Sequence, residues 1–91
     1  MPVYQNHYTL STLAATQIVE PDVEPQEVWI HDAEHSASTE VFLGNSSVTA
    51  LNGLHLHSAE TIKFILPPND TIWAISGSGS PTIHIMRVTQ H

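Results

Sequence analysis

The feature that most constrains the fold is a series of short runs rich in β-branched and aromatic residues, separated by residues typical of turns. The alternation is clearest in residues 61–66, where Ile62 and Leu66 share one face and Lys63 takes the other. Such runs, without an amphipathic helical pattern, predict an all-β fold: a small antiparallel β-sandwich or barrel. The predicted strands are residues 27–31, 39–44, 54–57, 61–66, 71–76 and 82–88.

The residues between these runs indicate where the chain reverses. Asn52 and Gly53 favour a tight turn, because both residue types tolerate positive φ. Residues 67–70 (Pro-Pro-Asn-Asp) favour a type I turn with Pro68 in its second position. Residues 77–81 (Gly-Ser-Gly-Ser-Pro) predict a flexible loop before the last strand.

The first part of the chain differs from the rest. Residues 1–26 show weak periodicity and end in two prolines set among acidic residues, which favours an extended segment. We therefore predict an extended N-terminal arm, residues 1–26, before a β-sandwich domain, residues 27–91. The arm is either a loosely packed terminus or a segment that binds a neighbouring subunit. In the second case its contacts would be Tyr4, Tyr8, Leu10, Leu13 and Ile18.

Size and cysteine content bear on stability and oligomeric state. The chain has 91 residues and no cysteine, so neither a disulfide nor a thiolate zinc site can reinforce its small core. Small domains without such reinforcement tend to associate. We therefore expect a homo-oligomer, with a trimer favoured.

The charge balance argues against two classes of partner. The chain has 2 Lys and Arg residues against 9 Asp and Glu residues, for a net charge of -7. Nucleic-acid binding needs several cations to displace the counterions of phosphates, and anionic membrane surfaces attract basic segments. We therefore expect neither nucleic acid nor membrane as a partner. No export signal is expected, nor is a membrane-spanning run of the roughly 20 residues required, so synthesis in the cytoplasm is predicted.

One pattern invites a metal-binding interpretation. His55 and His57 are two residues apart on a predicted strand, so their side chains share a face, and Glu60 follows closely. This spacing superficially resembles the first metal motif of cupins, but the glutamate comes too early and no second motif is recognisable. We favour a structural interpretation, in which the two histidines form the polar face of a half-buried strand. No metal and no cofactor are therefore expected.

The residues that would support catalysis are few. The sequence has no cysteine and no Gly-x-Ser-x-Gly motif, and residues 77–80 are more typical of a hairpin loop than of a nucleophile. We therefore expect that the protein is not an enzyme. Trp29 and Trp73 are expected in the core. The alternative is that one of them is an interface anchor.

The order of strands and turns from Val28 to Val88 resembles that of small β-sandwich virion proteins of tailed bacteriophages. The segments that carry the resemblance are residues 41–44, 47–49, 52–54, 57–62, 66–70, 73–76 and the final run to Val88. The resemblance covers about two thirds of the chain, includes no catalytic signature and leaves out the first 26 residues.

The resemblance implies a viral structural protein. It suggests a capsid decoration or minor capsid (cement) protein that binds the major capsid protein on the outer surface of the virion. Within the same class, a tail or head-tail connector component is the alternative. Two other classes stay open: a carbohydrate-binding β-sandwich, which would need an exposed tryptophan flanked by polar groups, and a cupin-like metal-binding protein.

Overall fold

The computed structural model describes residues 3–33, 39–57 and 59–89. The prediction of an all-β fold is confirmed, because the regular elements of the described residues are all strands. Within the same residues there is no helix long and apolar enough to cross a membrane. The strands are β1 (Val3–Thr9), β2 (Thr16–Val19), β3 (Gln26–Asp32), β4 (Glu40–Gly44), β5 (Leu54–Leu56), β6 (Thr61–Leu66), β7 (Ile72–Ser78) and β8 (Thr82–Thr89).

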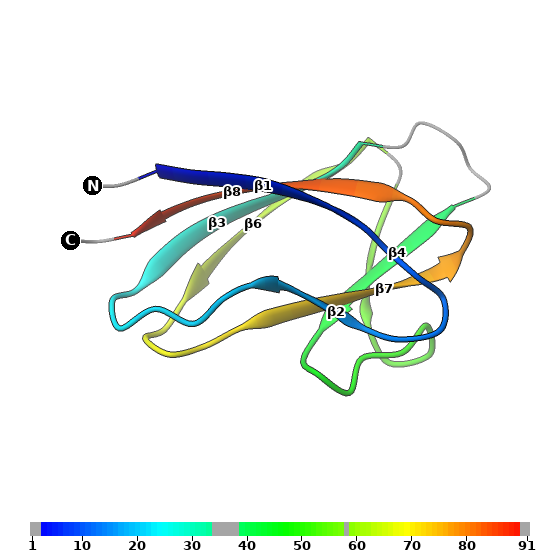
Figure 1. Cartoon of the computed structure of the whole chain (residues 1–91), viewed down its shortest axis with the longest axis horizontal. Helices are drawn as coiled ribbons and strands as arrows, with labels where there is room; N and C mark the ends of the chain where they lie inside the picture. Colours follow the sequence, from blue (N-terminus) through cyan, green and yellow to red (C-terminus); the bar gives the residue numbers. More distant parts are fainter. Residues whose placement is uncertain (1–2, 34–38, 58, 90–91) are drawn as a thin grey trace.

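The strands form two antiparallel sheets packed face to face (Figure 1). Sheet A has the order β1-β8-β3-β6, and sheet B has the order β2-β7-β4-β5. The edge strands are therefore β1 and β6 in sheet A, and β2 and β5 in sheet B. The start of β1 and the end of β8 lie side by side at one end of the sandwich (Figure 1).

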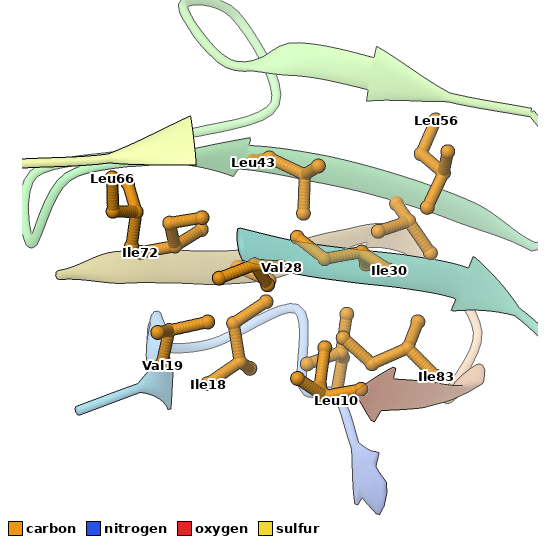
Figure 2. Packing of buried hydrophobic residues seen from close by; sticks show 13 residues of the cluster. Leu10, Ile18, Val19, Val28, Ile30, Leu43, Leu56, Leu66, Ile72 and Ile83 are labelled. Carbon is orange, nitrogen blue, oxygen red and sulfur yellow. The ribbon is translucent and has the colours of Figure 1, made fainter. Parts of the chain in front are cut away.

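The core lies between the sheets and follows from the alternation of side chains along each strand. In β3, Val28 and Ile30 are buried, while Trp29 and His31, which alternate with them, are partly exposed. Figure 2 shows these aliphatic side chains meeting between the two sheets. The buried cluster consists of Leu10, Ile18, Val19, Val28, Ile30, Val41, Leu43, Leu56, Leu66, Ile72, Ala74, Ile83 and Ile85.

The prediction of an arm separate from the sandwich is wrong for residues 3–26. β1 pairs with β8 along its whole length, and β2 pairs with β7. Leu10, Ile18 and Val19 belong to the buried cluster. The first part of the chain therefore contributes one strand to each sheet, because its aliphatic residues complete the core. Residues 1 and 2 lie outside the described residues.

A buried glutamine ties this segment to the middle of sheet A. Gln26 is 1% exposed. Its Nε2 donates a hydrogen bond to the carbonyl of Glu20 at 2.9 Å, and its Oε1 accepts one from Nη1 of Arg87 at 2.8 Å. Because both ends of its amide are bonded, this buried polar side chain is compatible with the core.

The turns differ in type from those predicted. Residues 67–70 do form a turn, with a hydrogen bond from the N–H of Asp70 to the carbonyl of Pro67 at 3.3 Å. Asn69 has a φ of 64°, which belongs to a type II turn and not to the predicted type I. Neither Asn52 nor Gly53 has positive φ, so this pair is not a tight hairpin. Instead, Oδ1 of Asn52 accepts a hydrogen bond from the N–H of Thr49 at 2.7 Å and closes a longer loop.

Ala59 occupies a strained backbone conformation before β6. Its φ is 61°, a region in which a Cβ atom is costly and glycine is not. The substitution Ala59→Gly is therefore expected to raise the free energy of unfolding by roughly 0.5–1 kcal/mol. Urea denaturation of both proteins measures the difference. Equal or lower stability of the variant would show that the turn does not hold this φ in solution.

Candidate functional site

β1 is the most exposed of the edge strands. All residues of this strand are exposed except Tyr8, which is half-buried. It contains no proline, aspartate, glutamate, lysine or arginine, the residues with which natural edge strands discourage pairing. β2 and β5, the edges of sheet B, have only 4 and 3 residues. We call residues 3–9, seen from the side away from β8, the β1 edge.

The direction of the backbone groups along this edge follows from the ladder with β8. The N–H of Leu10 donates to the carbonyl of Pro81 at 2.9 Å, in continuation of the β1–β8 register. Because backbone groups in an antiparallel ladder alternate between the two sides of a strand, the odd-numbered residues of β1 direct theirs away from β8. Among the described residues, the N–H of His7 donates only to the side chain of its neighbour, to Oδ1 of Asn6 at 2.9 Å. The β1 edge therefore offers a row of unpaired backbone groups.

Two tyrosines border the β1 edge. Tyr8 lies opposite the core residue Ile83, so the even-numbered side chains of β1 lie on the inner face of sheet A. Tyr4 is 44% exposed, and the guanidinium of Arg87 lies 4.5 Å from the centre of its ring. A hollow of about 130 Å³ opens here, and its lining includes both tyrosines, Arg87 and Glu20. Tyrosine and arginine are enriched where proteins bind one another.

A row of histidines crosses the outer face of sheet A, the face turned away from sheet B. His7, His84 and His31 lie in register on β1, β8 and β3. The ring centroids of His7 and His84 are 6.2 Å apart, and Nδ1 of His31 is 2.8 Å from the hydroxyl of Thr61. These three residues, the histidine row, line an open hollow of about 460 Å³.

Trp29 also lines this hollow. It is half-buried, and the ammonium of Lys63 lies 5.3 Å from the centre of its ring. The same ammonium is 4.0 Å from a carboxylate oxygen of Glu27. Trp29 is therefore a partly accessible side chain among polar groups, as a carbohydrate platform would require, but a cation already lies against its ring.

The residues that were weighed as a metal motif and judged structural each have other contacts. The ring centroids of His55 and His57 are 4.5 Å apart, but Oε1 of Glu60 accepts a hydrogen bond from the N–H of His57 at 2.9 Å. The ring of His55 stacks on Phe42 at 4.9 Å, and its Nε2 is 3.9 Å from Oε2 of Glu40. Within the described ranges, no three His, Asp or Glu side chains are grouped so that they could hold a metal ion.

The structure also shows how the strand with these histidines packs. Leu56 is buried, as the structural interpretation expects, but Leu54 is 50% exposed. Because β5 is an edge strand of only three residues, sheet A does not fully cover the side chain of Leu54. Leu54 borders an apolar hollow of about 250 Å³ with Phe64 and Leu66.

The predicted partner-binding residues separate into two groups. Leu10 and Ile18 are buried in the core, so their contacts are within this chain, whereas Tyr8 packs against the core but stays half-buried at the β1 edge. Leu13 is 92% exposed in the loop between β1 and β2, and Tyr4 is partly exposed at the β1 edge. Only these last two present a large part of their side chain to a partner.

The β1 edge and the histidine row are features that we did not predict from the sequence. Tyr4 and Tyr8 fall on one side of a two-residue alternation, with Gln5 and His7 on the other, and this period is typical of a strand. The histidine row had no such sign, because its members come from three strands far apart in the sequence and meet only through the register of sheet A.

Comparison with known proteins confirms the fold. No family model and no curated protein matches the sequence. A chain from Bacillus endospore appendages, which form a novel family of disulfide-linked pili, has a similar solved structure, with a TM-score of 0.61 and 12% sequence identity. The alignment covers 99% of the present chain and 87% of the other. At that identity the likeness concerns the fold alone, so the conclusion is a small two-sheet β-sandwich with an exposed edge strand.

Proposed function

We propose that this chain is a structural, non-enzymatic subunit that binds other protein subunits. The observation that carries the proposal is the β1 edge: seven uncharged residues of an edge strand, all exposed except the half-buried Tyr8, with Tyr4, Tyr8 and Arg87 along its border. Such an edge is a template for pairing with another protein, and a stable monomer would usually protect it.

The assembly that we propose is the outer shell of a tailed bacteriophage, with the major capsid protein as the partner. The support is the resemblance of residues 28–88 to small virion proteins and the acidic charge of the chain. With a net charge of -7, the chain would be repelled by packaged DNA, so the outside of the shell suits it better than the inside. A position in the tail or head-tail connector fits the same features and is the alternative within this class.

A second candidate function is that of a subunit of a self-assembled surface fibre. The likeness to the endospore appendage chain favours it, because that protein forms pili on the same kind of fold. Those pili are disulfide-linked, whereas the present chain has no cysteine. A fibre of this chain would therefore be held by strand pairing and side-chain contacts alone.

Immunogold electron microscopy of particles purified from the source culture tests the proposal. We expect an antibody raised against the purified chain to label the surface of phage heads. Labelling confined to tails would support the connector alternative, and labelling along filaments would support the fibre. Particles that are free of label, with all of the chain in the soluble fraction, would contradict a structural role.

A further inference from the structure

We propose that two copies of this chain associate through their β1 strands, paired antiparallel about a two-fold axis at Asn6. Sheet A of one copy then continues into sheet A of the other. The inference rests on the proposed function, since it identifies self-association as one contact of the assembly. It names the partner of the β1 edge as a second copy of the same chain.

The backbone of β1 is suited to this register. Val3, Gln5, His7 and Thr9 direct their N–H and C=O groups to the free edge, by the alternation described above. Pairing about Asn6 places Gln5 opposite His7 of the second copy, and Val3 opposite Thr9. Each of these opposed pairs exchanges two hydrogen bonds in an antiparallel ladder. The local hydrogen bond from the N–H of His7 to Oδ1 of Asn6 is replaced by a ladder bond.

The side chains are also compatible with this register. A two-fold axis perpendicular to the sheet keeps inner-face residues on the inner face in both copies. Tyr4 then lies opposite Tyr8 of the second copy, and aromatic cross-strand pairs stabilise antiparallel sheets. On the outer face, the amide of Gln5 meets the imidazole of His7, two side chains that can hydrogen-bond. No two charged side chains of β1 are brought together, because the strand has none.

The other long edge is a poorer site for pairing. In β6 the alternation directs the backbone groups of Thr61, Lys63 and Ile65 to the free side, since the N–H of Asp32 bonds the carbonyl of Glu60. Lys63 lies in the middle of that edge, and lysine there discourages strand addition.

Cysteine cross-linking tests the register, and the native chain has no cysteine to interfere. Because the backbone groups of Asn6 point toward β8, Asn6 and Asn6 of the second copy face each other as a pair without hydrogen bonds. The Cα atoms of such a pair are about 4.5 Å apart, a distance that a disulfide spans. We expect Asn6→Cys to form covalent dimers at least roughly tenfold faster than Leu13→Cys, because a preformed contact raises the effective thiol concentration. Leu13 is the matched control, since it is 92% exposed but lies outside the strand.

A mixing experiment separates this register from others. Tyr4→Cys and Tyr8→Cys are expected to cross-link with each other when mixed, and neither with itself. Self-linking of Tyr4→Cys would indicate a parallel pair or another register and would overturn the proposal. So would equal rates for Asn6→Cys and Leu13→Cys, or a trimer as the only associated species in analytical ultracentrifugation.

A charge variant tests whether the edge itself carries the contact. Adding Gln5→Lys to Asn6→Cys is expected to slow cross-linking at least roughly tenfold, since lysine on an edge strand opposes pairing. Met86→Lys is the matched control, because Met86 lies beside Gln5 on β8, one strand in from the edge. Circular dichroism confirms that each variant is folded. Equal slowing by both lysines would overturn the proposal.

The outcomes distinguish this inference from the proposed function. Cross-linking is measured on the purified chain, whereas the function is tested by labelling of particles. Specific cross-linking without labelled particles would leave the dimer established and refute the shell. Labelled particles without specific cross-linking would refute the self-pairing of β1 alone.

Discussion

Deletion of residues 1–26 is expected to unfold the chain. The deletion removes β1 from sheet A and β2 from sheet B, and with them the core residues Leu10, Ile18 and Val19. It also exposes β8 and β7 as new edges of the two sheets. Loss of the cooperative thermal transition, followed by circular dichroism, is the measurement.

The size of the effect follows from the small margin of a domain of this length. Truncating one buried leucine or isoleucine to alanine costs about 2–5 kcal/mol, while a whole domain is stable by about 5–15 kcal/mol. Removing three buried aliphatic residues together with two strands therefore exceeds the available stability. Addition of a peptide of residues 1–26 should restore part of the native signal. A truncated chain that kept a cooperative transition would instead support the separate arm that the sequence predicts.

Leu10→Ala and Leu13→Ala are expected to differ strongly although the residues are three positions apart. Leu10 is 1% exposed and belongs to the core, whereas Leu13 is 92% exposed. Leu10→Ala should lower the free energy of unfolding by about 2–5 kcal/mol through lost burial and the cavity left behind. Leu13→Ala should change it by no more than about 0.5 kcal/mol.

Urea denaturation of the two variants and the parent chain gives the comparison. The midpoint should fall for Leu10→Ala while the slope against urea stays constant, since the same surface is exposed on unfolding. Leu13→Ala serves as the control for the chemical change itself. Equal stability of the two variants would mean that residues 10–13 do not pack in solution as they do in the structure.

The strands in which apolar and polar residues alternate were the ones that the sequence predicted best. β3, β6 and β8 are close to the predicted ranges, because their apolar residues alternate with polar ones and the sandwich covers the apolar face. β1 and β2 were missed for different reasons. β1 carries tyrosines and polar side chains because sheet B leaves it largely uncovered, and β2 has only four residues in which to show a pattern.

The candidate site was less predictable than the fold. Tyr4 was named as a partner contact and lies at the β1 edge, but Leu10 and Ile18 were named on the same grounds and are buried. Hydrophobicity alone cannot separate a residue that binds a partner from one that fills the core. The two histidines at 55 and 57 attracted notice because they are close in sequence, whereas the histidine row is assembled by strand register.

The sequence by itself determined the all-β class, the absence of disulfides and the acidic, charge-poor surface. These properties depend on composition and on the local period of side chains, which act within a few residues. Only the tertiary structure decided that the first segment completes both sheets, that β1 is a free edge and that three distant histidines form one row. Those features depend on which strands pair and in which register, and long-range pairing is set by packing of the whole core.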